Sequence, residues 1–414
     1  MSTPSPRTQG AEPPTLSVAQ LDEDPHGVFR RYRHLTPLLK REKAGYIAIR
    51  AADIEPLAFD PRTRQIETEQ LAVRGIHSGP LVELWSNSML FSNGGEHRRR
   101  RAPMSRAFAF KLIEEMRPRI RAAARNILEQ HLQAGELAGE LNFLGGFASL
   151  IPAHIIANIL GIPPADVPHF TELVYSVSRS LSTSYANAEI QGMEESARQL
   201  MEYVNGLFGT RGAALNNEFL ASYLKTATEA DNICAAEILS QVVTIIIAGS
   251  DTTRGAIAVQ VALLLQHREQ WDAVCADPAL IPGAVSESLR YEPVVGSIPR
   301  FTLEDIEIDG YLVPRNSILS LSTLSAMRDP AQYLEPDRFN IRRTDHPRRH
   351  LIFGLGVHRC LGEILARAEL EESLAALTSL LPQLQLAGTP PSLQGHGGIR
   401  RIDGMRVQWA ARGG

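Results

Sequence analysis

The sequence predicts a single, mainly α-helical domain with a small β portion. Long stretches repeat apolar residues at the spacing of an α-helix, strand patterns occupy two short segments, and neither a repeat nor a linker divides the 414 residues. A chain of this length can form one large globular body. Residues 1–15 are polar and rich in proline, so we expect a disordered N-terminal tail there and the folded domain in residues 16–414.

The expected helices differ in how they end and in how much of their surface is apolar. Phe147–Leu160 ends at GIPP, a glycine and proline stop signal, and Met104–Gln133 contains Pro118, which could interrupt it. Ala235–His267 is apolar around most of its circumference, which predicts a buried central helix. Two shorter helices are expected at Gly283–Tyr291 and Leu361–Leu381.

Strand patterns are fewer and lie together. Asp305–Pro314 alternates apolar and polar residues around Asp309-Gly310, which predicts a hairpin. Ser317–Thr323 predicts one further strand.

Composition excludes several classes of function. The net charge of −4 gives no basic excess of the kind that nucleic-acid binding requires. The N-terminus lacks the apolar core of a signal peptide, and the most apolar run, Val242–Gly249, is too short to cross a membrane. Three cysteines, Cys234, Cys275 and Cys360, cannot all pair, which favours a reducing compartment. We therefore expect a cytoplasmic protein without a membrane or nucleic-acid partner, and a monomer.

The segment FGLGVHRCLG, residues 353–362, carries the most chemistry. Gly354 and Gly356 permit a tight loop before Cys360, and a helix follows almost at once. Backbone N–H groups at a helix N-terminus stabilise a thiolate, which is the axial ligand that helps haem iron break an O–O bond. From the residues alone, a buried cysteine in a glycine-rich turn is about equally consistent with this segment.

Three other segments are ambiguous when taken alone. In AGSDTT, small Ala248 and Gly249 would let a flat ligand approach the helix, and Thr252 can bond a carbonyl one turn back; a flexible helix with a single acid fits as well. Glu287 and Arg290 are spaced for an ion pair, which is ordinarily a weak surface pair. The four arginines at 98–101 would ordinarily form a solvated face.

Residues 353–362 resemble the haem-binding motif of the cytochrome P450 family. The match covers Phe353, Gly356, His358, Cys360 and Gly362, whereas Leu355 and Arg359 lie at variable positions. The resemblance implies that Cys360 binds the iron of haem b, that His358 bonds a haem propionate, and that Phe353 packs beside the thiolate.

The other segments resemble the same family, and the similarity spans nearly the whole chain. AGSDTT is similar to its oxygen-binding groove, which implies that Asp251 and Thr252 deliver protons beside Ala248 and Gly249. The pattern His-x-x-x-Arg implies propionate contacts for His97 and Arg101, although Pro103 departs from the commonest pattern. Arg300 matches a further propionate position. Glu287 and Arg290, with Arg338 from PDRF, would form a buried structural triad that fixes the cysteine loop.

The implied fold is one domain with haem between the long central helix and the helix after the cysteine loop, as in the bacterial soluble class. The implied activity is a monooxygenase that inserts one oxygen atom of O2 into an organic substrate by hydroxylation or epoxidation. NAD(P)H electrons would arrive through a ferredoxin and its reductase, because no flavin or iron–sulfur module is fused to the chain. Some of Arg98, Arg99, Arg100 and Arg106 would then guide an acidic ferredoxin to the cysteine side.

Two alternatives remain open. A peroxide-driven peroxygenase of the same fold typically replaces the acid–Thr pair, so Asp251 and Thr252 argue against it. A non-catalytic haem sensor or carrier needs no such pair and usually brings an output domain.

The sequence identifies the substrate only by class. Candidate pocket residues are mostly apolar, which predicts a small hydrophobic or weakly polar substrate, although core packing explains any one of them nearly as well. Terpenoid, aromatic and fatty compounds all fit. The candidates are Ile247, Ala248, Val294, Val295, Ile298 and the Trp85–Phe91 segment.

Overall fold

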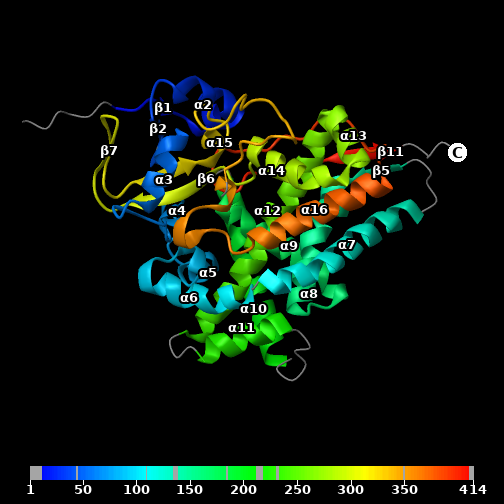
Figure 1. The fold of residues 1–414 in the computed structure, drawn as a ribbon. Coiled ribbons are helices and arrows are strands. Elements are labelled where there is room, and N and C mark those ends of the chain that lie inside the picture. Colours follow the sequence, from blue (N-terminus) through cyan, green and yellow to red (C-terminus); the bar gives the residue numbers. More distant parts are fainter. Residues whose placement is uncertain are drawn as a thin grey trace, which may run out of the picture.

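The long helix α12 (Ala235–Gln266) runs through the middle of the molecule, with helices around it and a sheet at one side (Figure 1). This computed structural model describes residues 12–42, 45–108, 110–133, 139–182, 185–210, 218–229, 233–347 and 350–409. The two largest apolar clusters of the core both include residues of α12: Ile246 belongs to one and Ile257 to the other. The predicted buried central helix is confirmed.

Helix α12 is more apolar over its length than its most apolar run suggests. Contrary to the expectation from Val242–Gly249, it is the one helix among the described residues long and apolar enough to cross a membrane, with a mean hydropathy of 1.4 over 18 residues. However, 72% of that window is buried inside the protein, and the helix packs against α8, α9, α10, α14 and α16. Its apolar surface is therefore that of a core helix.

Most of the other helices surround α12. The helix expected at Met104–Gln133 is two helices: α6 begins earlier, at Gly94, and ends at Ala107, while α7 begins at Phe110 and continues through Pro118. Helix α16, after the cysteine loop, lies beside α7 (Figure 1). The remaining long helices are α8 (Leu150–Leu160), α9 (Val167–Ser178), α10 (Ile190–Thr210), α11 (Glu218–Glu229), α13 (Arg268–Ala276), α14 (Ile281–Tyr291) and α16 (Glu363–Leu380).

Shorter helices connect these elements to the sheet region. They are α1 (Val18–Glu23), α2 (Pro25–Arg33), α3 (Ala51–Phe59), α4 (Glu69–Val73), α5 (Pro80–Ser86) and α15 (Thr323–Ala326).

A six-stranded mixed sheet with the order β1-β2-β3-β9-β6-β4 forms most of the β portion. The expected strand at Ser317–Thr323 is β9 (Ile318–Ser322), and the expected hairpin is β7 (Ile306–Ile308) with β8 (Tyr311–Val313). The other strands of the large sheet are β1 (Thr15–Leu16), β2 (Leu38–Arg41), β3 (Gly45–Ala48), β4 (Thr63–Arg64) and β6 (Ser297–Thr302). A three-stranded sheet joins β5 (Gly139–Asn142), β10 (Gln385–Leu386) and β11 (Arg406–Trp409).

Residues 13–15, which the sequence assigns to a disordered tail, are part of the folded domain. Pro13 is buried, the Pro14 carbonyl accepts a hydrogen bond from the Lys40 N–H at 2.9 Å, and Thr15 pairs with Lys40 in the sheet. Pairing with β2 orders this polar segment, which composition alone does not indicate. Residues 1–11 lie outside the described residues.

Candidate active site

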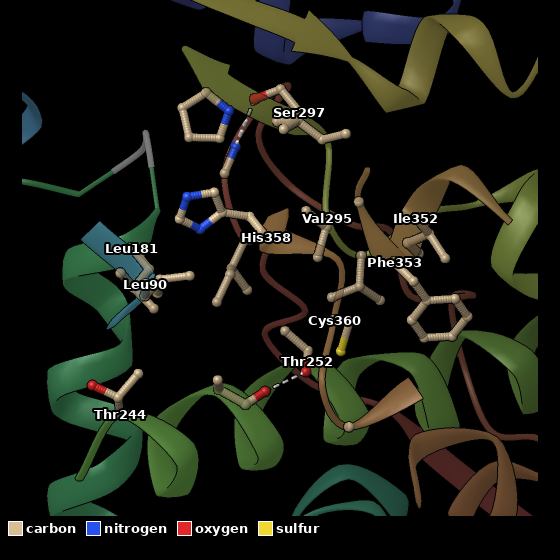
Figure 2. A pocket seen from close by; sticks show the side chains of 18 of the residues that line it. Leu90, Leu181, Thr244, Thr252, Val295, Ser297, Ile352, Phe353, His358 and Cys360 are labelled. Carbon is tan, nitrogen blue, oxygen red and sulfur yellow. Dashed lines mark hydrogen bonds between the residues drawn. The ribbon is translucent and has the colours of Figure 1, made fainter. Parts of the chain in front are cut away.

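A cavity of about 660 Å³ lies between α12, the loop before α16, and strands β6 and β9. Its volume is within the usual range for small-molecule sites. Figure 2 shows the Cys360 sulfur in this space, with Thr252 of α12 below it and Phe353 beside it. Predicted residues that line the cavity are Arg101, Ala248, Gly249, Thr252, Val294, Val295, Ile298, Phe353, His358, Cys360 and Gly362.

The cysteine loop is held in a tight turn by its own backbone. Gly354 and Gly356 have φ of 74° and 64°, in the region that favours glycine. The Cys360 N–H donates to the Phe353 carbonyl at 2.7 Å, and α16 begins three residues after Cys360. The loop therefore presents the thiol to the cavity from a fixed backbone.

The surroundings of Cys360 act on its thiol in opposite directions. Burial raises the pKa of the thiol, while the Gly362 N–H and the cationic Arg101 and Arg359 lower it. Burial has the larger effect, so the helix N-terminus alone does not produce the thiolate that the sequence suggested. A metal ion bound at the sulfur would supply the missing positive charge, because a coordinating thiol is deprotonated outright.

Four nitrogen-bearing side chains lie near one another: Arg101 and His358 line the cavity, and His97 and Arg300 lie behind its wall. His97 and Arg101 come from α6, and the centre of the His97 ring lies 4.0 Å from the centre of the His358 ring. Burial and the nearby cations lower the pKa of His97 to about 4 and that of His358 to about 3. Buried Arg300, whose pKa burial lowers to about 10, donates to Gln65 Oε1 at 2.9 Å.

This cluster fits an anionic group. The neighbours that lower the pKa of His97 and His358 are arginines and, for His358, also the His97 ring. The buried Nε2 of His97 has no hydrogen-bond partner among the described residues. An orphaned buried nitrogen is rare in a native site unless a ligand satisfies it. The residues present therefore fit haem carboxylates on this side and haem iron at Cys360.

The groove of α12 has the predicted local geometry. Thr252 Oγ1 donates to the Ala248 carbonyl at 2.7 Å, one turn back (Figure 2). Among the described residues, only Ile156 lies within 4 Å of where a Cβ on Gly249 would stand, at 3.5 Å. Gly249 thus leaves open space beside the cavity for a flat ligand.

Asp251 faces away from Thr252. Its carboxylate accepts a hydrogen bond from Ser178 Oγ at 2.7 Å and forms an ion pair with Arg254. The Arg254 guanidinium lies 3.9 Å from the centre of the Tyr175 ring. The structure thus places the two expected proton-delivery residues side by side on α12, one at the cavity and one in a polar cluster against α9.

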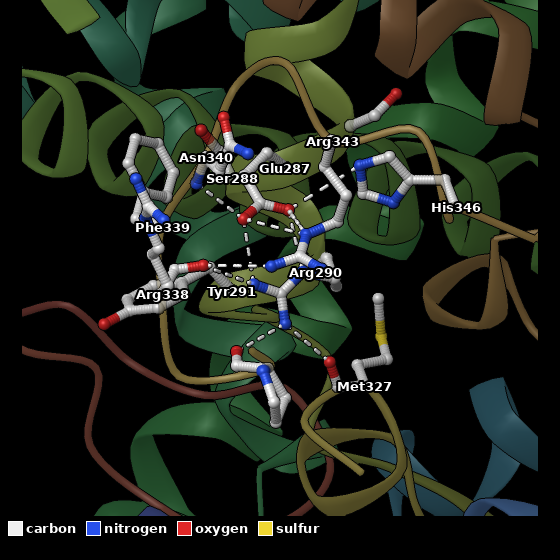
Figure 3. A network of polar contacts seen from close by, with 12 residues as sticks. Glu287, Ser288, Arg290, Tyr291, Met327, Arg338, Phe339, Asn340, Arg343 and His346 are labelled. Carbon is white, nitrogen blue, oxygen red and sulfur yellow. Dashed lines mark hydrogen bonds and ion pairs between the residues drawn. The ribbon is translucent and has the colours of Figure 1, made fainter. Parts of the chain in front are cut away.

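Glu287 and Arg290 form the buried pair expected of them (Figure 3). Arg290 donates to both carboxylate oxygens of Glu287, at 2.7 and 2.9 Å, and to the carbonyls of Met327 and Pro336. Both side chains are inaccessible to solvent. Full pairing of this kind is what a buried charge requires.

Arg338 is not the third member of this triad, contrary to the sequence prediction. Its side chain is 67% exposed and pairs with Glu335, whereas Arg343 is 5% exposed and lies 3.1 Å from the Glu287 carboxylate. Arg338 contributes only its carbonyl, which accepts from Arg290 and Arg343. The spacing of PDRF matched the motif, but the turn that follows it directs Arg343 inward instead.

The triad is connected to the cysteine loop through α14. His350, just before the loop, hydrogen-bonds the Ser286 carbonyl at 3.0 Å, and Arg367 donates to Ser286 Oγ. The Arg367 guanidinium also lies 5.1 Å from the centre of the Phe353 ring. These contacts are consistent with the structural role expected of the triad.

Two of the predicted pocket positions are wrong. Ile247 is fully buried in the core and does not line the cavity, because the lining residues Thr244, Ala248 and Thr252 lie on the other side of α12. Trp85 is also buried in the core, and its indole donates to Ser180 Oγ at 3.1 Å. At the other end of its segment, Met89, Leu90 and Phe91 do line the cavity.

The arginines expected to guide a partner divide between the surface and the interior, as the expectation that some of them face solvent allows. Arg99 and Arg100 both bind Glu237 at the start of α12, with distances of 2.7 to 2.9 Å, and Arg100 is buried. Their hydrogen bonds lower the pKa of Glu237 to about 2, in spite of its burial. Arg98 and Arg106 are exposed.

Several residues of the cavity wall had no recognisable signal in the sequence. Glu369 of α16 is buried, lines the cavity, and has its pKa raised by burial to about 8. Its neighbours Glu371 and Glu372 instead pair with arginines of α7, and nothing in the helical pattern distinguishes the three. Arg41 of β2 and Arg74, which follows α4, also line the cavity.

Comparisons with known proteins agree with this geometry. Residues 279–388 match the family model for cytochrome P450. The chain is 43% identical over 397 residues to a plant-inducible cytochrome P450, pinF1, of Rhizobium radiobacter, which covers 96% of this chain and 93% of that protein. It is 34% identical over 307 residues to nocardicin C N-oxygenase of Nocardia uniformis subsp. tsuyamanensis, which covers 74% of each.

Solved structures show the same fold. The structure of CxnD, a cytochrome P450 for C–S bond formation in chuangxinmycin biosynthesis, aligns with a TM-score of 0.84 at 29% identity and covers 97% of this chain and 100% of that one. The extent of these similarities, together with a cysteine thiol, a threonine groove and an orphaned histidine around one cavity, shows that the chain belongs to the cytochrome P450 family, whose enzymes are haem b monooxygenases.

Proposed function

We propose that this monooxygenase hydroxylates or epoxidises a small, largely apolar organic compound in the cytoplasm. The observation that carries the proposal is the position of the Cys360 thiol and the Thr252 hydroxyl in the wall of one mainly apolar cavity. Haem b, when bound, supplies the iron at which dioxygen is activated. Its electrons would come from NAD(P)H through a ferredoxin and its reductase.

The chain would hold haem b at two places, its iron and its propionates. Cys360 would bind the iron from a loop fixed by the hydrogen bond between its N–H and the Phe353 carbonyl. His97, Arg101, Arg300 and His358 would bind the propionates, because charge-assisted hydrogen bonds are the strong ones and this cluster has no other anion to satisfy it among the described residues.

Thr252 and Asp251 would supply the protons that the reaction consumes. The Thr252 hydroxyl is at the cavity and bonds the Ala248 carbonyl, so a rotation of its side chain can turn the proton toward the cavity. Asp251 is held behind it by Ser178 and Arg254. The apolar wall would keep bulk water out of the cavity, so protons would arrive through these two side chains and not from solvent at random.

The surface over the cysteine loop is suited to an electron-donor protein. Val357 is 66% exposed in the loop, and Phe59, 53% exposed, stands beside Gly356. Arg101 bonds the Arg359 carbonyl at 2.6 Å, so α6 lies against the loop and Arg98, one turn earlier, is on the same side of the helix. An apolar centre with a cationic rim matches the usual anatomy of a transient interface with an acidic partner.

The test is optical first and chemical second. The reduced, carbon-monoxide-bound holoenzyme should have the strongly red-shifted Soret band of thiolate-ligated haem, and Cys360→His should lose both the band and oxygenation. With ferredoxin, reductase and NAD(P)H, a screen of apolar compounds should give products that carry one atom of 18O from 18O2. A histidine-type band would contradict the haem assignment, and turnover with peroxide but not with reduced ferredoxin would support the peroxygenase alternative instead.

A further inference from the structure

The mouth of the cavity carries charged side chains, whereas its interior is mainly apolar. Val18 and Val73 line it and are both exposed, so they mark the mouth. Arg41, at the end of β2, and Arg74, just after α4, also line the cavity. The mouth therefore combines apolar side chains with two guanidinium groups.

Arg41 is held toward the cavity by a chain of hydrogen bonds. Its Nη1 lies 3.4 Å from His396 Nε2, and His396 Nδ1 lies 2.6 Å from Asp22 Oδ1. Because arginine only donates, Nε2 is the acceptor and Nδ1 carries the proton that goes to Asp22. Arg41 thus rests against the His396 ring, which in turn contacts the carboxylate of Asp22.

Arg74 is held from the other side of the mouth. Its guanidinium lies 4.5 Å from the centre of the Tyr185 ring, and its Nη1 donates to the Tyr185 carbonyl at 3.3 Å. After burial, the charge of Arg74 is the largest influence that lowers the pKa of Arg41. The two cations are therefore close enough to repel each other, and an anion between them would relieve that repulsion.

This pair is separate from the cluster assigned to the haem propionates. The groups that act on His358 are His97, Arg300 and Arg101, whereas those that act on Arg41 are the cationic Arg74 and the anionic Asp22. Besides Asp22 and His396, Glu42 is a further ionisable group at the mouth, and it is exposed and lines the cavity. Water screens an exposed carboxylate, so Glu42 offsets the two cations only in part.

We infer that Arg41 and Arg74 bind a carboxylate of the substrate, so that the substrate class is an organic acid with an apolar body. The apolar body would extend along the cavity toward Thr252 and Cys360, and the carboxylate would stay at the mouth. Arginine suits this role because its planar fork matches a carboxylate in two parallel hydrogen bonds. The inference rests on the proposed function and narrows its substrate from apolar compounds in general.

The test compares matched ligands on the holoenzyme. Dissociation constants would be measured from the Soret shift, and by calorimetry, for decanoic acid, 1-decanol and decyl phosphate, and for 4-phenylbutanoic acid and 4-phenyl-1-butanol. Each carboxylic acid should bind at least tenfold more tightly than its alcohol at low salt. Arg74→Gln and Arg41→Gln should each remove most of that preference and leave the alcohols within twofold, whereas Glu42→Gln should tighten the acids.

The controls separate this inference from the proposed function. Arg31→Gln, at an exposed arginine of α2 outside the cavity, should leave every ligand unaffected. Arg74 is only half-buried, so its variant should fold even where Arg41→Gln does not. Equal affinity for acids and alcohols in a protein with a normal thiolate band would overturn the inference alone, as would a preference for the phosphate that Arg74→Gln leaves intact.

Discussion

The centres of the His97 and His358 rings lie 4.0 Å apart, although His97 comes from α6 and His358 from the cysteine loop. His97 is buried and His358 is half-buried, both beside Arg101, and His97 Nε2 has no partner among the described residues. Two imidazoles and an arginine in one place are a costly arrangement unless an anion joins them. An anion such as the proposed haem propionates would satisfy this arrangement.

Loss of one of these contacts should speed the loss of haem. His97→Phe, Arg101→Gln and Arg300→Gln should each raise the rate of haem transfer to apomyoglobin by roughly ten- to a hundredfold, because a charge-assisted hydrogen bond contributes about 1.5–3 kcal/mol. Arg98→Gln is the matched control on the same helix, since Arg98 is exposed. An unchanged rate in all three variants would contradict the propionate assignment.

Arg343 and Arg338 provide a second test, because the structure exchanges their predicted roles. Arg343→Gln should destabilise the protein by about 3–5 kcal/mol, since it removes one partner of a buried carboxylate. Arg338→Gln should change stability by less than about 1 kcal/mol, because Arg338 makes only an exposed pair with Glu335. Urea unfolding followed by circular dichroism measures both. The reverse order of effects would restore the motif-based assignment.

These two arginines also show what the sequence can and cannot predict. Short motifs with fixed backbone requirements, such as the glycines before Cys360, identify their residues directly. Arg338 stands at the motif position, but whether Arg338 or Arg343 is buried depends on the turn between them. Arg41 and Arg74 lie far apart in sequence, and only the fold brings them to one cavity. No periodicity contains that information.

Glu369 should make stability depend on pH. Its pKa is raised from 4.5 to about 8, so the folded protein retains a proton that the unfolded chain releases. Between these two pKa values the folded state binds more protons than the unfolded state. The free energy of unfolding therefore is highest below about pH 4.5, as far as this group is concerned, and decreases as the pH rises to about 8. Each unit of the difference corresponds to about 1.4 kcal/mol, so the loss is on the order of a few kcal/mol.

Glu369→Gln should remove this dependence. The thermal midpoint of the holoenzyme, measured from pH 5 to 9, should fall less steeply in Glu369→Gln than in the wild type. Glu371→Gln is the control on the same helix, because Glu371 pairs with Arg117 at the surface. Parallel profiles for the wild type and Glu369→Gln would show that Glu369 is ionised in the fold.

Electron transfer should depend on Arg98 and on the apolar centre above the cysteine loop. Arg98→Gln should slow reduction by ferredoxin several-fold at low salt, and the wild-type rate should fall as ionic strength rises. Val357→Ser should weaken docking at all salt concentrations, because its contribution is apolar. Stopped-flow reduction under carbon monoxide measures each rate. In contrast, Arg99→Gln should act chiefly on stability, since Arg99 binds Glu237.

Thr252 and Asp251 are adjacent in sequence but occupy different environments. Thr252 holds the hydroxyl at the cavity, so Thr252→Ala should still oxidise NAD(P)H while diverting most of the electrons to hydrogen peroxide. Thr252→Ser keeps the hydroxyl and should remain largely coupled. Peroxide formed per NAD(P)H consumed is the measurement, and full coupling in Thr252→Ala would require another proton donor, such as a hydroxyl of the substrate.

Asp251 should affect the rate of proton delivery more than the coupling. Its carboxylate is bound by Ser178 and Arg254 and must leave one of them to carry a proton to the cavity. Asp251→Asn should therefore slow turnover at least tenfold and enlarge the solvent isotope effect, with product per NAD(P)H little changed. Arg254→Gln loosens Asp251 without removing it and should not reduce turnover. If Asp251→Asn instead behaved like Thr252→Ala, with fast NAD(P)H oxidation and peroxide release, the two residues would share one role at the cavity and the polar cluster around Asp251 would only shape α12.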